Sequence, residues 1–523
     1  MVILSKKKKT LTNQLSILAI TSALSLHTNA NDAVGFNNYN KWDAIEAAFN
    51  NSSSSEIAKL SVEELESIAN SCAAQGLSDT VPGLVIAITH KNQVVVERGY
   101  GSKRSDVYEP VDAQTLFRPG STQKMMTAAA VLVQQERNKL KLSDSIQGLV
   151  PEAQFFSQPT HEQNEISIHN LLSHTSGIPD QTLVQCDDDL TLTNWAENLT
   201  YTHTMSPANL FFNYTNGGFM MAGLVAERAA GIPYADLMQS TVWGPSNMNS
   251  TFATLEQAMN YPNQSYGHTS VTGELMSIPM NDYSCEAASP PGLGFTTIGD
   301  LARWTIMLMS GGGKTLSHES VKQMLSAQVN MSGGDPSRHY GYGVEIQNLL
   351  DVNEGNVGAR IPPIIEHGGN VPGWNAHTIM LPKAEFSISV MNNNDGGASG
   401  VAYCILENSG IVSDTVEVPE PILTGPDDWQ QYQGGYLLRY PTGQILPTFV
   451  YLDNDLLRVI SFLPGLNDWA YFEAVQLNES HFILVDSNSG EEVSEITFIK
   501  EVNTKRDMWI RNRQIVGKRL FGY

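Results

Sequence analysis

The stretch that decides the fold is Arg118-Pro119-Gly120-Ser121-Thr122-Gln123-Lys124. The Ala/Val/Leu-rich residues that follow its Pro-Gly pair predict a helix from near Ser121 to about Gln135. Because residues three apart share a helix face, Ser121 and Lys124 would lie side by side. A lysine amine whose pKa is lowered by burial or by a nearby cation can take the proton of a serine hydroxyl. Alone, however, S-x-x-K also describes a capping serine beside a surface lysine.

Two further motifs accompany this stretch. Tyr214-Thr215-Asn216 stands directly before a helix-like apolar run at Phe219–Ala230. His367-Gly368-Gly369 stands just ahead of two strand-like segments, where small residues would let a substrate backbone lie against a sheet edge.

In this order and spacing, the motifs resemble those of the class C β-lactamases, the serine D,D-peptidases and the related D-aminopeptidases and family VIII esterases. The resemblance covers roughly residues 60–410. It also includes Leu171–Pro179 (LLSHTSGIP), Gly294–Arg303 (GFTTIGDLAR) and Pro372-Gly373-Trp374. It implies a serine hydrolase that works through an acyl-enzyme, with no metal and no cofactor.

The resemblance assigns the covalent chemistry to three side chains. Ser121 would be acylated by the substrate carbonyl. Lys124 and Tyr214 would share the proton transfers, with Tyr214 as the acid that protonates the leaving group. Water would then release the acyl group.

Four further positions would bind the substrate. Asn216 would hydrogen-bond its amide or carbonyl, and the backbone N–H groups of Ser121 and Asn370, next to Gly369, would form the oxyanion hole. Such a donor typically lowers the barrier by about 3 kcal/mol. His367 stands where many relatives carry a lysine, and its reference pKa near 6.5 makes it a neutral imidazole. A fixed cation for a substrate carboxylate is then missing, which favours a peptidase, D-aminopeptidase or esterase over an efficient β-lactamase.

The periodicity along the chain predicts the fold class. Strand-like runs at Leu84–Thr89, Val94–Gly99 and Phe386–Val390 enclose a helix-rich middle, so the sheet would be made from both ends of this region. We expect an α/β (α+β) fold of the β-lactamase/transpeptidase type, in which an antiparallel sheet is flanked by helices and carries an all-helical subdomain. After it, about seven short β-rich runs indicate an antiparallel sandwich or barrel that resembles lipocalin-like modules.

Composition shifts give the expected boundaries. Residues 1–30 have the basic, apolar and small-residue regions of a signal peptide, with cleavage near Ala30, so we expect a periplasmic or secreted protein without stable membrane insertion after cleavage. The other expected segments are a lead-in at 31–60, the hydrolase domain at 61–410, a linker at 411–428 and a β-rich domain at 429–523.

The net charge and the composition limit the kinds of molecule that the protein is expected to bind. The 523 residues carry a net charge of −23, which becomes −27 once the four lysines of the signal segment are removed. Such a surface repels nucleic acid and anionic membranes, although it also describes any acidic, soluble exported protein. The chain has no C-x-x-C or H-E-x-x-H pattern to support a zinc site. The partner we expect is a small peptide, amide or ester substrate, while the sequence leaves the oligomeric state open.

The cysteines and one histidine have simpler interpretations. Cys72 and Cys404 fall on apolar faces of the first and last helices of the hydrolase region, where buried thiols are the default. Cys186 and Cys285 could form a disulfide in an exported protein, but the sequence does not fix the pairing. His174 is interpreted as a structural turn residue.

Several functions stay open at this stage. No G-x-S-x-G elbow supports an α/β-hydrolase. A peptidase of the D,D-carboxypeptidase or D-aminopeptidase type is favoured, with a carboxylesterase or weak β-lactamase as alternatives. A protein of another class, which binds cell-wall peptides without catalysis, would not need the set formed by Ser121, Lys124 and Tyr214.

Overall fold

A computed structural model describes most of the chain from Ser61 onward. The described residues are 61–156, 165–180, 190–199, 202–270, 275–282, 284–331, 338–351, 359–411, 416–417, 423–440, 444–463, 467–500, 508–512 and 515–521. The predicted signal peptide (1–30), the predicted lead-in (31–60) and Cys186, for which a disulfide with Cys285 was left open, lie outside these residues. Within them, no helix is both long and apolar enough to cross a membrane.

The larger part of the fold is built on an antiparallel sheet of nine strands. Its order is β2-β1-β12-β11-β10-β9-β8-β7, and β13 pairs with β9. The first and last long strands are neighbours, with Ile86 opposite Val390, as the sequence predicted. The strands are β1 (Gly83–His90), β2 (Gln93–Gly101), β7 (Val329–Asn330), β8 (Arg338–Tyr340), β9 (Glu345–Asp351), β10 (Ala359–Val371), β11 (Trp374–Leu381), β12 (Phe386–Asn392) and β13 (Val416–Glu417).

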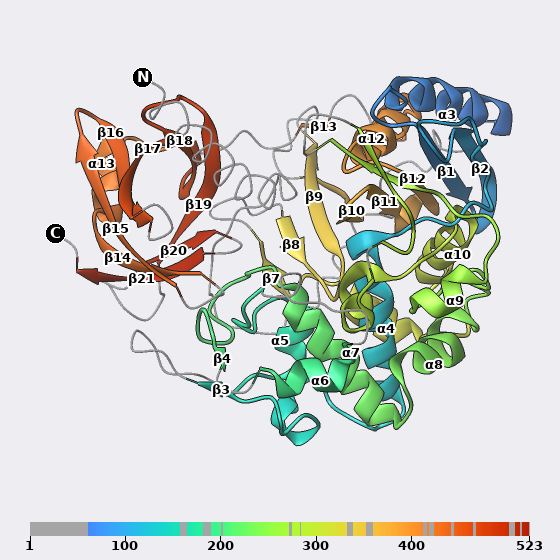
Figure 1. Ribbon diagram of the computed structural model, residues 1–523, viewed down its shortest axis with the longest axis horizontal. Helices are drawn as coiled ribbons and strands as arrows, with labels where there is room; N and C mark the ends of the chain where they lie inside the picture. Colours follow the sequence, from blue (N-terminus) through green and yellow to red (C-terminus); the bar gives the residue numbers. More distant parts are fainter. Residues whose placement is uncertain are drawn as a thin grey trace.

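Helices cover both faces of this sheet (Figure 1). On one face lie α3 (Val62–Gly76) and α12 (Ala398–Asn408), which contact each other. Cys72 and Cys404 join them in a disulfide, so the prediction of two buried thiols was wrong. Cys72 is buried and Cys404 is half-buried against the same apolar cluster, and the adjacency of the two helices brings the sulfurs together.

The opposite face supports the helix-rich part. Helix α4 (Gln123–Glu136) is buried over almost its whole length, and it packs against α7 (Asn216–Ala230) in the largest hydrophobic core. The other helices here are α5 (Ile168–Leu172), α6 (Leu192–Glu197), α8 (Tyr234–Met238), α9 (Leu255–Met259), α10 (Ile298–Met309) and α11 (His318–Met324). Two short strand pairs, β3 (Phe155–Phe156) with β4 (Thr202–His203) and β5 (Gly267–Thr269) with β6 (Met276–Ile278), complete it.

The C-terminal part is a closed antiparallel barrel of eight strands, preceded by α13 (Pro426–Trp429). Seven of them match the predicted runs. The eighth, β21, was missed because its Val-Gly-Lys-Arg sequence lacks the alternation of a strand. Its Gly517 approaches β14 so closely that an added Cβ would lie 2.4 Å from the carbonyl oxygen of Leu437. The strands are β14 (Gly434–Arg439), β15 (Ile445–Asp453), β16 (Leu456–Leu463), β17 (Asp468–Asn478), β18 (His481–Asp486), β19 (Glu492–Lys500), β20 (Met508–Asn512) and β21 (Ile515–Phe521).

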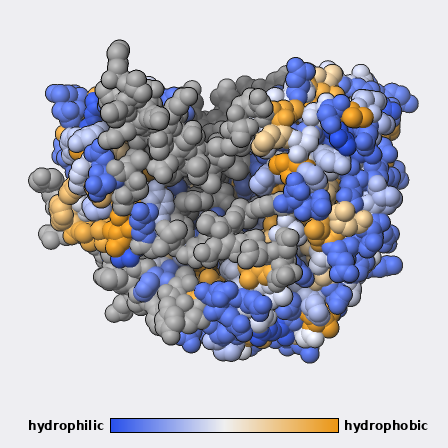
Figure 2. Space-filling view, in the orientation of Figure 1, coloured by the Kyte–Doolittle hydropathy of each residue, from blue (hydrophilic) through white to orange (hydrophobic). Residues whose placement is uncertain are grey.

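The predicted fold class is therefore confirmed, including the all-β C-terminal domain. The surface is mostly hydrophilic, in keeping with the net charge, although an apolar area lies over the barrel (Figure 2). Exposed aromatic side chains of the barrel include Phe449, Trp469 and Phe521, whose rings contact one another through Phe449.

The barrel contacts the larger part of the fold directly. Phe211 and Met205, from the segment before α7, share a small buried cluster with Ile499, Trp509 and Val516 of β19, β20 and β21. The ring centroids of Phe211 and Trp509 lie 5.8 Å apart. The segment before α7 is therefore packed between the helical core and the barrel.

Candidate active site

Ser121 lies in a single 3₁₀ turn (Gly120–Thr122) that leads into α4. Gly120 has a φ of +55°, and a Cβ at this position would lie 2.5 Å from the backbone nitrogen of Asn370. Glycine is therefore required both by the backbone conformation and by the close approach to β10. The turn thus brings Ser121 against the strand that carries the His-Gly-Gly motif.

Lys124 projects from the first turn of α4, and its side chain is fully buried. Its Nζ donates hydrogen bonds to Ser121 Oγ at 3.0 Å, to Asn216 Oδ1 at 2.8 Å and to the carbonyl oxygen of Pro291 at 2.7 Å. The ammonium has three donors, so these three acceptors fix its direction. When the amine is neutral, the same contact with Ser121 can run in reverse, with the hydroxyl donating to nitrogen.

Tyr214 and Asn216 are positioned by the start of α7. Thr215 caps this helix by accepting a hydrogen bond from Gly218 N, and Asn216 N donates to Asp180 Oδ1 at 2.9 Å. These contacts place Asn216 at the first helical position and Tyr214 just outside it. The Nζ of Lys124 lies 4.7 Å from the centroid of the Tyr214 ring, so the hydroxyl, amine and phenol side chains meet in one place.

His174 packs against the segment that carries Tyr214 and Thr215. It is buried, with a φ of +57°, and its Nδ1 accepts a hydrogen bond from Thr215 N at 3.2 Å. Its ring packs against Tyr214 with centroids 4.2 Å apart and against Tyr340 at 4.8 Å. These are the contacts of a structural residue, which is how the sequence was interpreted.

His367 is buried on β10, and both of its ring nitrogens have partners in the protein. Its Nδ1 lies 2.6 Å from the carbonyl oxygen of Gly368, which can only accept, so Nδ1 carries the proton. Nε2 then accepts from the hydroxyl of Tyr340 at 3.0 Å. Burial, together with the nearby charge of Lys124, lowers the pKa of His367 to about 3. The imidazole is therefore neutral, as expected, and is turned toward Tyr340.

Gly369 and Asn370 of β10 lie against the turn that carries Ser121. A Cβ on Gly369 would lie 2.0 Å from the carbonyl oxygen of Pro119 and 3.1 Å from Ser121 N. The side chain of Asn370 donates to the carbonyl oxygen of Asp395, and Asn375 Nδ2 donates to the carbonyl oxygen of Gly369 at 2.8 Å. A Cβ on Gly120 would meet Asn370 N and a Cβ on Gly369 would meet Ser121 N, so the Ser121 turn and β10 pack tightly against each other here.

Sequence reasoning missed three residues of this site. Pro291 supplies an acceptor for Lys124, and a Cβ on its neighbour Gly292 would lie 3.0 Å from Ser121 N. Tyr340 joins His367 to His174. The Pro290-Pro291-Gly292 run was a detectable turn signal, whereas nothing local in the sequence marks Tyr340.

Comparison with known proteins gives the family. Residues 69–406 match the model of the Beta-lactamase family. The chain belongs to this family. The predicted family membership is therefore confirmed.

Individual relatives of this Beta-lactamase family chain are distant. The unguisins hydrolase ungD' of Aspergillus campestris is 23% identical over 327 residues, which cover 60% of this chain and 58% of that protein. The D-aminopeptidase of Gluconobacter oxydans is 20% identical over 333 residues, or 62% of this chain and 58% of that protein. The chain thus spans about three fifths of these relatives.

A solved structure extends the likeness to the C-terminal barrel. The crystal structure of SurE covers 88% of this chain and 100% of its own, with a TM-score of 0.66 and 18% identity. At this identity the likeness shows the fold alone.

Proposed function

We propose that this Beta-lactamase family hydrolase is a peptidase that acts on small peptides through an acyl-enzyme at Ser121. The observation that carries the proposal is the 3.0 Å contact between Lys124 Nζ and Ser121 Oγ inside a buried, hydrogen-bonded frame. A general base must lie within about 2.6–3.2 Å of the heavy atom that carries the proton, and this contact between nitrogen and oxygen meets that requirement.

In the proposed reaction, the neutral amine of Lys124 takes the hydroxyl proton while Ser121 Oγ bonds to the substrate carbonyl carbon. The backbone N–H groups of Ser121 and Asn370 stabilise the negative oxygen that develops. The C–N bond then breaks, and the leaving amine receives its proton from the hydroxyl of Tyr214, which regains one from Lys124. In the second half of the reaction, Lys124 takes a proton from a water molecule, whose oxygen bonds to the acyl carbon. The ester bond to Ser121 then breaks, and Ser121 Oγ regains its proton.

The substrate class follows from the lining of the site. The neutral His367 offers no fixed cation to a substrate carboxylate, so the site lacks the feature that would favour β-lactams. The amide of Asn216 can bind a substrate peptide group while it also accepts from Lys124. The similarity to a protein named D-aminopeptidase supports peptides that contain D-amino acids, of the D,D-carboxypeptidase or D-aminopeptidase type.

We also propose that the protein is exported to the periplasm or the medium. The disulfide between Cys72 and Cys404 supports this, because such bonds persist in oxidising compartments and are rare in the cytosol. Mass analysis of the protein recovered separately from the cytosol, the periplasm and the medium of an expressing cell would test it. Recovery from the periplasm or medium with a mature N-terminus close to Ala30 supports the proposal, and recovery from the cytosol alone with an intact N-terminus contradicts it.

The activity is tested by a fluorescent acyl-phosphonate probe together with a substrate panel. The probe should label the wild-type protein and not Ser121→Ala, since only an activated serine reacts. The panel contains D-Ala-D-Ala peptides, D-aminoacyl amides, short-chain p-nitrophenyl esters and nitrocefin. Turnover of the peptides or amides supports a peptidase, turnover of the esters alone indicates an esterase, and fast nitrocefin hydrolysis indicates a β-lactamase. A chain that is neither labelled nor active would be a binding protein.

A further inference from the structure

Arg511 of the barrel reaches into the hydrolase part of the protein. Met508 and Ile510 of β20 belong to the barrel core, so strand alternation places Trp509 and Arg511 on the outer face. That face meets the segment before α7, where Trp509 contacts Phe211. Arg511 is nevertheless only 7% exposed, so its guanidinium lies inside the contact between the two parts.

The guanidinium connects two segments that flank the catalytic groups. Its Nη1 donates to the carbonyl oxygen of Phe212, two residues before Tyr214. Its Nη2 lies 3.4 Å from the carbonyl oxygen of Met331, which follows β7, and 3.5 Å from Thr497 Oγ1 of the barrel. One barrel side chain thus ties the Tyr214 segment to the edge of the large sheet.

Both segments belong to the same buried cluster. Phe212, Met331 and Tyr340 pack together, and Tyr214 packs against them. Tyr340 in turn donates to His367, the residue just ahead of Gly369 and Asn370. A shift of either carbonyl group held by Arg511 would therefore be transmitted to Tyr214 or to the oxyanion strand.

The chemistry of the contact argues for a positioning role. Within the described residues, all three acceptors of Arg511 are uncharged, and burial lowers the pKa of its guanidinium to about 10. Burying a cation without a carboxylate is unfavourable, and an apolar side chain would join two domains at lower cost. The planar guanidinium does offer several donors in fixed directions, which an apolar group cannot.

We propose that Arg511 is a positioning residue for Tyr214, and that the barrel is a required part of the active site. This inference rests on the proposed role of Tyr214 in proton transfer. Arg511 holds the carbonyl group of Phe212 and thereby sets where the phenol lies relative to Lys124 and Ser121. Small displacements of catalytic groups can lower rates by about 100-fold.

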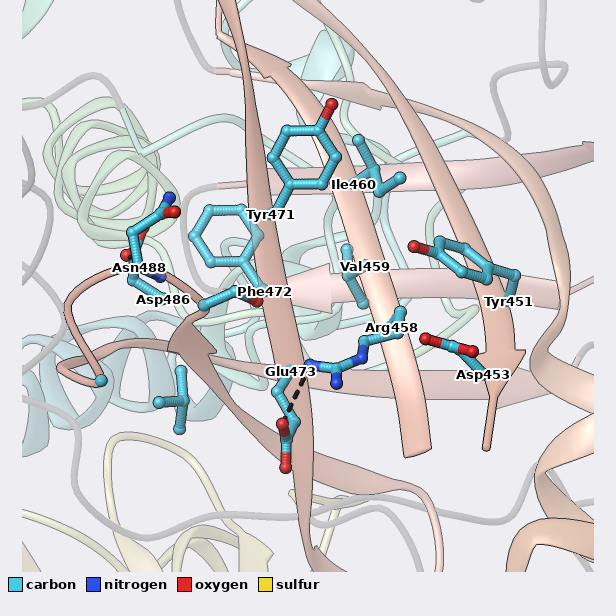
Figure 3. Close-up of a pocket in the computed structure, with 13 residues that line it drawn as sticks. Tyr451, Asp453, Arg458, Val459, Ile460, Tyr471, Phe472, Glu473, Asp486 and Asn488 are labelled. Atoms are coloured by element: carbon cyan, nitrogen blue, oxygen red, sulfur yellow. Dashed lines mark hydrogen bonds and ion pairs between the residues drawn. The ribbon is translucent and has the colours of Figure 1, made fainter. Parts of the chain in front are cut away.

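The test uses three full-length variants. Arg511→Met keeps an unbranched side chain that can fill the space of the arginine stem, and it removes every donor. Arg511→Lys keeps a charge and can reach one carbonyl oxygen, but not two in the fixed directions of a guanidinium. The matched control is Arg458→Met, which removes another arginine from the barrel. Arg458 pairs with Glu473 at 2.9 Å and lines a barrel pocket of about 540 Å³ (Figure 3). Strand β16 lies four strands from β20 in the closed barrel, on the opposite wall.

Two measurements are made on each variant. The first is the rate of Ser121 labelling by the acyl-phosphonate, together with kcat and KM on the best substrate. The second is hydrogen–deuterium exchange of residues 205–216, which does not depend on catalysis. For Arg511→Met we expect labelling and kcat to fall about 10- to 100-fold with KM within about threefold, since positioning and not binding is lost. Exchange of 205–216 should rise, Arg511→Lys should be intermediate, and Arg458→Met should match the wild type.

Other outcomes separate the two proposals. Labelling, kcat and exchange of 205–216 that are unchanged in Arg511→Met would overturn the role of Arg511. If Ser121→Ala is labelled like the wild type, the proposed function fails, while a rise in exchange confined to 205–216 still supports the hold of Arg511 on this segment. If Arg511→Met does not fold, the comparison rests on Arg511→Lys, and wild-type rates and exchange in that variant would count against the proposal.

Discussion

Lys124 and Asn216 stand 92 positions apart in the sequence, and their side chains meet at 2.8 Å between Nζ and Oδ1. The contact joins the first turn of α4 to the first residue of α7, the two helices that form the centre of the large core. Lys124 is thereby held against Ser121 by groups that do not themselves react. If Lys124 is the base that we propose, it is already positioned before the substrate arrives, which is the condition for an efficient proton transfer.

Lys124→Arg should abolish most activity while keeping a positive charge. An arginine side chain does not deprotonate in proteins, so it cannot accept the proton of Ser121. We expect the rate of acylation to fall by about 10²- to 10⁴-fold, the usual contribution of a general base. The acyl-phosphonate labelling rate measures this, and Lys139→Arg is the control, because Lys139 is exposed and lies beyond the C-terminal end of α4. Acylation of Lys124→Arg at the wild-type rate would exclude Lys124 as the base.

The burial of His367 predicts a stability that depends on pH. Its pKa is lowered to about 3 in the folded protein, whereas the unfolded chain has a value near 6.5. The unfolded state therefore binds this proton first, and the stabilising contribution is complete above pH 6.5 and is lost as the pH falls toward 3. The loss should approach about 1.4 kcal/mol per pH unit. His367→Gln removes this contribution, so urea unfolding at pH 7 and pH 4.5 should give a smaller difference than in the wild type.

The control for that measurement is His318→Gln, since His318 is exposed at the start of α11. Its pH dependence should match the wild type. An equal pH dependence in His367→Gln and the wild type would show that His367 titrates at an ordinary value and is not buried as described.

The sequence could place the candidate side chains locally because each motif combines chemistry with a local structural signal. Ser121 and Lys124 are three residues apart at a helix start, and Tyr214 and Asn216 flank a helix cap at Thr215. Such short-range relations follow from helix geometry alone. The meeting of the motifs was instead inferred from the family resemblance, because no local signal reports which distant segments are neighbours.

The residues that the sequence did not reveal act across long distances. Tyr340 and Arg511 look like ordinary strand residues, and their roles depend on which segments the sheet and the barrel bring beside them. The disulfide was missed for the same reason, since Cys72 and Cys404 each have the pattern of a buried helical face. Tertiary packing decided these features, and hydrophobic periodicity carries no information about it.

Removing the disulfide between Cys72 and Cys404 should lower stability without affecting catalysis. The bond closes a loop of 332 residues between α3 and α12, and the loss of such a bond typically costs about 2–5 kcal/mol. Both helices lie on the face of the sheet opposite α4, so Ser121 should be labelled at the wild-type rate below the unfolding temperature. Urea unfolding of the double variant Cys72→Ala/Cys404→Ala measures the first effect. An unchanged free energy of unfolding would contradict the expectation.

Gly120→Ala should lower acylation with only a modest effect on the rest of the fold. The methyl group would lie 2.5 Å from Asn370 N, and the φ of +55° is unfavourable for alanine, so the turn must move away from β10. The two oxyanion donors then separate, and loss of one such donor typically lowers kcat by about 10²- to 10³-fold. Gly400→Ala in α12 is the control, because nothing lies within 4 Å of its added methyl and alanine favours a helix. If Gly120→Ala acylates as fast as Gly400→Ala, then the approach of Gly120 to Asn370 does not set the geometry of the oxyanion hole.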